Sequence, residues 1–388
     1  MSPTALPPEV RRGLPVLVGG RFAGNVGIRF AYPFLPAIAR GLGISADTAG
    51  LALTIRELSG LAAPAAGRAI DRGRRRAGLL VGLVGCAAGL ALAGAASGFF
   101  WFTVAVTGFG TAKMAYDTAM STWIGDHVPW DRRGQVVGLG EVSWAASLLV
   151  AVPLLGLAID AWGWRSAFFV VAGANLLAAV AVPATIAPDP PAGTVASNRL
   201  RLLPGALGLY ATMGLLSFGI QLVVVSYGFW LEDDFGWSIP TIGIASILLG
   251  VGELCGTGTM ILLADRLGKR RTLLIGTAAL VPPLALLGTA GSSGLVGIAL
   301  LAVAVTAFEL AFVSGLPLIT ELDPDARGAG VGMALALVTV ARAVGTIGGT
   351  TLYVRTGMGW TGLTAAVTIA LAGVVTLLAV REPRSTAL

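Results

Sequence analysis

The chain contains about twelve long apolar segments separated by short charged loops, and this pattern restricts the folds open to it. A helix needs roughly 20 mostly apolar residues to cross a bilayer. The segments are continuous rather than alternating, which excludes a membrane β-barrel. Helices are then the remaining structure in which all backbone N–H and C=O groups form hydrogen bonds within lipid. We predict an all-α membrane protein with twelve transmembrane helices, centred near Asn25, Ile55, Cys86, Ala112, Ser147, Val171, Gly219, Gly250, Ala279, Thr306, Val340 and Ile369.

The charge content agrees with a membrane protein. Only 12% of the residues are charged and the mean hydropathy is +0.84, whereas soluble chains carry about 25% charged residues. The net charge of +6 comes from loop residues, so the expected partners are membrane lipids with anionic headgroups, and not nucleic acid. Both cysteines, Cys86 and Cys255, lie in apolar segments and are read as reduced packing residues. Arg21 interrupts the first segment without a cleavage site, so we expect a retained first helix.

A polar stretch divides the chain into two halves. Residues 188–201 (PDPPAGTVASNRLR) are rich in Pro, Gly, Ser and Asn, as linkers are. We predict an N-terminal six-helix bundle over 1–187, a cytoplasmic linker over 188–203 and a C-terminal six-helix bundle over 204–388. Most of the 26 Lys and Arg residues fall in alternate loops. The positive-inside rule then places both termini in the cytoplasm and the chain in the plasma (inner) membrane.

The two halves repeat one another. Asp71-Arg72 recurs as Asp265-Arg266, and the aspartates are 194 positions apart. Gly134 and Gly328, which end WDRRG and PDARG, have the same separation. One offset therefore matches the loops after the second and eighth segments and those after the fourth and tenth. A pseudo-symmetric pair of six-helix units is typical of alternating-access transporters.

The loop GRAIDRGRRR, residues 67–76, resembles the signature loop of the major facilitator superfamily (MFS). The matching residues are Gly67, Asp71, Arg72, Arg74 and Arg75, and ADRLGKRR at 264–271 is a weaker echo. The elements RRG at 132–134 and ARG at 326–328 are similar to further loop motifs of that family. The resemblance implies the MFS fold and a transporter, nearest to the twelve-helix drug/proton antiporter group.

In that family the matching aspartate and arginines hold a cytoplasmic gate closed. The resemblance therefore implies gating roles for Gly67, Asp71, Arg72, Arg75, Asp265, Arg266 and Arg342. The aspartate would meet the N-terminus of the eleventh helix, where free N–H groups favour an anion. The alternative for the loop arginines is that they only set topology and bind lipid.

Charged residues inside the apolar segments are the next candidates for function. Each costs about 2.5–3.5 kcal/mol or more at mid-membrane, so it needs a partner or a wet cavity. An intramembrane carboxylate can bind a proton and lose it when a cation approaches. The proton-coupling candidates are Glu309, our first choice, followed by Asp117, Glu141, Glu253 and Glu57. A relay role for His127 is a minor alternative.

Helical spacing groups the candidate residues of the substrate cavity. Arg21, Asn25 and Arg29 are four apart and share one face of the first helix, and Lys113, Tyr116 and Asp117 share a face of the fourth. In the MFS the first, fourth, seventh and tenth helices line the cavity, which adds Gln221, Tyr227 and Trp230. The alternatives are a structural Lys113–Asp117 pair and an interfacial position for Tyr227 and Trp230. Arg56 and Glu57, as helix neighbours, should point in different directions, which would let Glu57 meet Arg342.

The sequence favours secondary active transport. Enzyme motifs and ATP-binding motifs are absent, so we expect no enzyme activity and no cofactor, with a proton gradient as the energy source. The leading hypothesis is proton-coupled export of small amphipathic compounds by a monomer. Two exporter motifs are incomplete: Val104 stands where an arginine is expected, and only Pro153 and Gly156 remain of a Gly-Pro-x-x-Gly-Gly run. The alternative substrate is therefore a small organic anion or nutrient, and a receptor or lipid handler is a third, weaker alternative.

Overall fold

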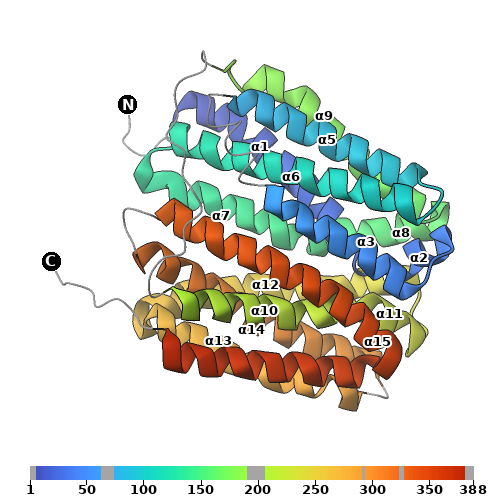
Figure 1. Cartoon of the computed structure of the whole chain (residues 1–388). Coiled ribbons are helices and arrows are strands. Elements are labelled where there is room, and N and C mark those ends of the chain that lie inside the picture. The colour runs from blue at the N-terminus through green and yellow to red at the C-terminus, as the bar shows by residue number, and fades with distance from the viewer. Residues whose placement is uncertain (1–5, 63–73, 190–205, 291–292, 323–326, 381–388) are drawn as a thin grey trace. The chain divides into compact units, whose positions relative to one another are not determined.

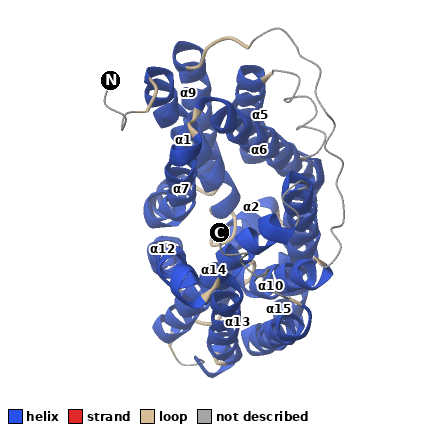
Figure 2. Cartoon of the chain, turned by 90° about the vertical axis from the view of Figure 1, so that its left-hand side faces the viewer, coloured by secondary structure: helices blue, strands red, loops and turns tan. Residues whose placement is uncertain are grey.

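The computed structural model describes residues 6–62, 74–189, 206–290, 293–322 and 327–380, and within these ranges the chain is helical with no strand (Figure 1). It divides into two compact units. Unit 1 comprises Met1–Ser45, Ile55–Ser197 and Ile239–Ile244, and unit 2 comprises Ala46–Thr54, Asn198–Ser238 and Ala245–Leu388. In each unit the helices run side by side, as Figure 2 shows in a view nearly along their axes.

The helices fall into two sets, one in each sequence repeat. The first repeat contains α1 (Pro8–Arg29), α2 (Leu35–Leu42), α3 (Ala46–Leu58), η1 (Ser59–Ala62), α5 (Arg75–Ala95), α6 (Phe99–His127), α7 (Trp130–Ala146), the π-helical turn η2 (Ser147–Ala151), α8 (Val152–Trp162) and α9 (Arg165–Thr185). The second contains α10 (Leu207–Val224), α11 (Tyr227–Asp233), α12 (Ile239–Leu267), α13 (Lys269–Ala285), η3 (Leu287–Ala290), α14 (Gly294–Leu322) and α15 (Arg327–Ala379).

The transmembrane passes follow from length and hydropathy. Eight helical stretches of the described residues are long and apolar enough to cross a membrane. The last of them, Gly330–Ala379, is interrupted at Gly357 and so makes two passes. Two further helices, α1 and α6, contain charges that lower their hydropathy, such as Arg21 and Lys113, and a third, α3, has only 13 residues. With these three, described helices lie in each of the twelve predicted segments.

The repeat extends to the backbone. Gly163, between α8 and α9, has φ 83° and ψ 163°, and Gly357, 194 positions later, has φ 78° and ψ 178°. This conformation is accessible essentially only to glycine, because a Cβ would clash with the backbone. Both glycines turn the chain between the last two passes of their repeat. The sequence repeat is therefore also a repeat of local structure.

Two arginine contacts repeat in the same way. In unit 1, Arg76 Nη2 donates to the carbonyl of Pro183 over 3.2 Å, which joins the start of α5 to the end of α9. In unit 2, Arg270 Nη2 donates to the carbonyl of Leu377 over 2.9 Å, which joins the start of α13 to the end of α15. Cationic side chains at helix C-termini satisfy carbonyls that lack an intrahelical donor. At least these two arginines therefore cap helix ends.

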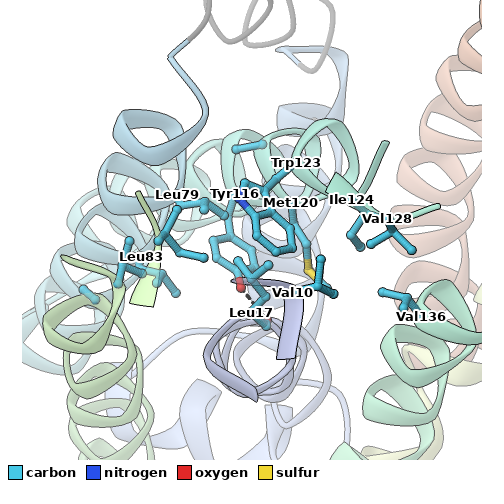
Figure 3. Close-up of a cluster of buried hydrophobic side chains, with 14 residues drawn as sticks. Val10, Leu17, Leu79, Leu83, Tyr116, Met120, Trp123, Ile124, Val128 and Val136 are labelled. Atoms are coloured by element: carbon cyan, nitrogen blue, oxygen red, sulfur yellow. Dashed lines mark hydrogen bonds between the residues drawn. The ribbon is translucent and has the colours of Figure 1, made fainter. Parts of the chain in front are cut away.

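The core of unit 1 near the start of α1 is built on aromatic and aliphatic side chains (Figure 3). Leu17 of α1, Leu83 of α5, Trp123 of α6 and Val136 of α7 belong to this buried cluster. Tyr116 of α6 points at α1 and donates a hydrogen bond to the carbonyl of Leu17 over 2.5 Å. A buried tyrosine hydroxyl needs such a partner. This contact fixes the register between α1 and α6, on which the polar residues of both helices depend.

Candidate transport site

The polar face of α1 packs against α7 within unit 1. Asn25 Nδ2 donates to Ser143 Oγ over 3.1 Å, and the Arg29 guanidinium lies 4.4 Å from the centre of the Trp144 ring. A Cβ placed on Gly140 would lie 3.0 Å from Arg21 Nη1, so Arg21 also reaches α7. The shared face predicted from the spacing of Arg21, Asn25 and Arg29 therefore exists. It faces the seam between α1 and α7, where Asn25 is buried.

A charged pair lies on α6, one helical turn apart. Lys113 Nζ donates to Asp117 Oδ2 over 2.5 Å, and the two side chains are 3% and 28% exposed. The contact between Lys113 and Asp117 that their four-residue spacing allowed is thus present. Burial makes an unpaired ammonium costly, so each charge stabilises the other. The role of the pair in proton coupling stays a prediction.

Arg56 and Glu57 belong to a second buried cluster in unit 1. Arg56 Nη2 lies 2.7 Å from Glu57 Oε1 and 2.9 Å from the Tyr32 hydroxyl, which itself donates to Glu57 Oε1 over 2.8 Å. Arg56 Nη1 donates to the carbonyl of Ile28 over 3.1 Å. The expectation that neighbouring side chains diverge is wrong here. The long guanidinium folds back, and Tyr32 bridges the two groups.

The candidates of the second repeat lie in unit 2. Gln221 Nε2 of α10 donates to Thr346 Oγ1 of α15 over 3.0 Å, and Thr346 Oγ1 donates to the carbonyl of Arg342 over 2.8 Å. The hydroxyls of Tyr227 and Ser246 are 3.2 Å apart. Trp230 is buried against Gly297 of α14. Its ring therefore packs inside unit 2, and whether it lies at the membrane interface stays a prediction.

The acidic candidates are spread over several helices. Glu253 is buried on α12, and Glu309 is half-buried on α14 with its Cβ against Gly256 of α12. Glu141 lies in α7, on the segment that contacts the polar face of α1. Their roles in proton coupling stay predictions.

The gating candidates are only partly within the described residues. Gly67, Asp71 and Arg72 lie outside them. Asp265 and Arg266 lie in the last turns of α12, and Arg266 is exposed. Arg75 Nε lies 2.7 Å from Asp126 Oδ2, a partly exposed ion pair between the start of α5 and the end of α6. Exposed pairs of this kind contribute about 0–1 kcal/mol, so this contact costs little to break, and the gating role of Arg75 stays a prediction.

Sequence reasoning missed several residues of the site. Ser143 and Trp144 are ordinary in a transmembrane segment, and their contacts with α1 span more than a hundred residues. The π-helical turn Ser147–Ala151 follows directly, and Pro153 comes just after it. Proline cannot donate to the preceding turn, and π turns recur at functional sites. The proline was the only available signal for this irregularity.

Comparison with known proteins decides the family. The family model of the Major Facilitator Superfamily matches residues 17–211 and again residues 209–388. The chain belongs to the Major Facilitator Superfamily. The two matches correspond to the two repeats, and the twelve-helix MFS fold predicted from the sequence is confirmed. MFS proteins are transporters, so the chain is an integral membrane transporter and not an enzyme.

Relatives and solved structures agree with this assignment. The chain is 28% identical over 363 residues to the tetracycline resistance protein, class G, of Vibrio anguillarum, which covers 87% of this chain and 89% of that protein. It is 28% identical over 183 residues to the multidrug resistance protein MdtG of Citrobacter koseri, covering 46% of this chain and 45% of that one. The crystal structure of a D-xylose–proton symporter has a TM-score of 0.80 at 17% identity, over 98% of this chain and 100% of that one. Transport is therefore established at the level of the superfamily, with drug-resistance proteins among the relatives.

Proposed function

We propose that the protein exports small amphipathic compounds in exchange for protons. The observation that carries this proposal is the Lys113–Asp117 pair, a carboxylate and an ammonium in contact inside a membrane-spanning helix. A half-buried carboxylate that already holds one cation is suited to exchange it for a proton or for a cationic substrate group. The names of two relatives, a tetracycline resistance protein and a multidrug resistance protein, support efflux as the direction.

Alternating access is the mechanism we propose. Helices of different repeats contact each other through small residues inside each unit. In unit 2, Gly50 of α3 contacts Thr350 of α15, and in unit 1, Gly156 of α8 lies against Gly243 of α12. Contacts between small residues are held by van der Waals packing. Because no ion pair has to break, we infer that they separate and re-form at a low cost in free energy. This supports a transporter that rocks between two states.

The remaining elements of the proposal follow from the sequence. Both termini lie in the cytoplasm, the protein sits in the inner membrane as a monomer among lipids, and it uses the proton gradient without a cofactor. The pair of Arg75 and Asp126 and the residues of the loop at 67–72 would then act at the cytoplasmic gate.

Transport into proteoliposomes tests the proposal. Purified protein is reconstituted, a pH jump acidifies the lumen, and uptake of tetracycline or ethidium is followed by fluorescence. We expect uptake that a proton ionophore abolishes and that Asp117→Asn reduces at least tenfold. Asp160→Asn serves as the matched control, because Asp160 is an exposed carboxylate on α8. Uptake unaffected by the ionophore, or equal in the two variants, would contradict proton coupling through Asp117.

A second candidate function is transport of a small organic anion. It is favoured by the cationic side chains of Arg21 and Arg29 on one face of α1 and by Lys113 on α6. Arg21→Gln separates the two candidates. An anion transporter would lose uptake of a probe such as benzoate, whereas an exporter of cationic compounds would retain ethidium transport.

A further inference from the structure

Asn175 is a fully buried polar residue in the middle of α9, with an exposed fraction of 0%. Its Nδ2 donates to the carbonyl of Val171 over 2.9 Å, and this contact fixes which atom of the amide is the oxygen. That oxygen, Oδ1, has no hydrogen-bond partner among the residues that the structure describes. A buried acceptor without a donor is costly, so Asn175 Oδ1 requires a donor from outside the side chains around it.

The seam between α1 and α9 brings Asn25 to the level of this oxygen. The two helices pack against each other within unit 1 (Figure 2). Towards the start of α1, a Cβ placed on Gly13 would lie 2.7 Å from Ile186 Cδ1. Just beyond the end of α1, the rings of Phe30 and Phe168 are 4.8 Å apart. The helices are therefore antiparallel, and between these two contacts their register places position 25 beside the turn of α9 that contains position 175.

The second repeat has the same register, but its residues are apolar. Positions 25 and 175 correspond to Gly219 and Ile369 under the offset of 194, and a Cβ placed on Gly219 would lie 2.7 Å from Ile369 Cδ1. Unit 2 therefore closes its seam at this level by direct contact of apolar atoms. Unit 1 has an asparagine at both positions, and Asn25 is only 2% exposed. Two buried amides thus replace the apolar contact.

The Asn25 amide is oriented by α7. Its Nδ2 donates to Ser143 Oγ over 3.1 Å, and Ser143 Oγ donates to the carbonyl of Gly140 over 2.5 Å. With the nitrogen of Asn25 turned to Ser143, the group it offers to α9 is the amide oxygen, which is an acceptor like Asn175 Oδ1. Two acceptors cannot bond to each other directly. A water molecule donates one hydrogen to each, and buried waters form about 2–4 such hydrogen bonds.

We propose that unit 1 holds one buried water between α1 and α9, bound by the side-chain oxygens of Asn175 and Asn25. The water satisfies Asn175 Oδ1 and keeps the Asn25 nitrogen turned to Ser143. It thereby joins α9 to the contact between α1 and α7, on the helix face that carries Arg21 and Arg29. No covalent bond is made or broken, and the inference depends neither on the substrate nor on the direction of transport.

Asparagine-selective isotope labelling makes this water measurable. The chain contains three asparagines, Asn25, Asn175 and Asn198, so labelled protein gives three side-chain amide signals that single substitutions assign. Water-edited solid-state NMR of the full-length protein in liposomes records which of these signals receive magnetisation from water. We expect transfer to both Asn25 and Asn175 at short mixing times, although both side chains are buried.

The variant Asn175→Leu removes one of the two acceptors and should abolish the transfer from water to Asn25. The matched control is Thr376→Val in the corresponding seam of unit 2. Thr376 is 0% exposed and its Oγ1 lies 3.0 Å from Thr212 Oγ1, so this polar pair is satisfied by direct contact. The control should leave the transfer to both asparagines unchanged.

Three results would overturn the proposal. The first is a folded wild-type protein in which the Asn175 signal receives no magnetisation from water, and this measurement decides the question even if Asn175→Leu does not fold. The second is a direct nitrogen-to-carbon contact between the Asn25 and Asn175 amides, which would show that they bond to each other. The third is a folded Asn175→Leu protein in which the transfer to Asn25 persists.

Thermal unfolding in detergent gives an independent sign. If Asn175 Oδ1 is bound to water, Asn175→Leu loses that hydrogen bond and should lower Tm by about 2–4 °C. If the oxygen had no partner at all, the same substitution would remove an unsatisfied buried acceptor and raise Tm. A Tm above that of the wild type would therefore contradict the water site.

Discussion

Substituting Glu57 by alanine should destabilise unit 1 strongly, because it removes the counter-ion of a buried cation. Arg56 is 2% exposed, and Glu57 supplies the charge that compensates it over 2.7 Å. Removing one partner of a buried ion pair costs about 3–5 kcal/mol. Arg56 keeps its contacts with Tyr32 and the carbonyl of Ile28, and Glu57 is 11% exposed, so the lower end of this range applies. We expect a loss of about 3 kcal/mol.

Thermal unfolding in detergent at a fixed scan rate measures this change. One kcal/mol shifts Tm by about 2–4 °C for a domain of 150–250 residues, so Glu57→Ala should lower Tm by about 6–12 °C. Glu57→Gln should cost less, because the amide oxygen still accepts hydrogen bonds from Arg56 and Tyr32. Replacing Arg56 by Met and Glu57 by Leu together should recover most of the loss, because no buried charge remains.

The matched control is Asp160→Ala, which removes an exposed carboxylate and should leave Tm within about 2 °C, since surface substitutions typically change stability by less than 0.5 kcal/mol. A Tm for Glu57→Ala as close to the wild type as that of the control would refute the reasoning. A double variant less stable than Glu57→Ala would also refute it, since it would show that the arginine contributes through packing and not through its charge.

Further predictions concern helix ends and turns. Asp189 accepts hydrogen bonds from the backbone N–H groups of residues 76 and 77 at the start of α5, so Asp189→Ala should cost about 0.5–2 kcal/mol and lower Tm measurably. Gly357→Ala should cost about 1–3 kcal/mol, while Gly173→Ala, in open helical space, should be neutral in the same melt. Burial, and then the charge of Asp233, raises the pKa of the Asp234 carboxyl. Because the charged form is disfavoured in the folded state, stability falls as pH rises from the unfolded value toward the folded one. Asp234→Asn should therefore be more stable than the wild type at neutral pH, and this gain should vanish below about pH 3.8. A difference in stability between the variant and the wild type that is the same at both pH values would contradict this prediction.

Local spacing predicted the parts of the site that lie on one helix. Lys113 and Asp117 are one turn apart, so their contact required no knowledge of the fold. The same rule placed Arg21, Asn25 and Arg29 on one face. The partners of that face could not be predicted, because Ser143 is 118 positions from Asn25 and nothing in its own segment marks it. Similarly, Arg56 and Glu57 were expected to point apart, but both contact Tyr32, which lies 24 positions before Arg56 in the sequence.

The sequence by itself determined that this chain is a helical membrane transporter of two related halves. That information is carried by hydropathy, loop charge and a repeat of 194 positions. Each of these depends on the order of residues along the chain and on their preference for lipid or water, and not on which helices pack together. Only the tertiary structure decided which charges are paired and which side chains are buried. The burial of Asn175 between α9 and α1 and the capping of α5 by Asp189 depend on the distance between helices, and that distance is set by the packing of many small residues at once.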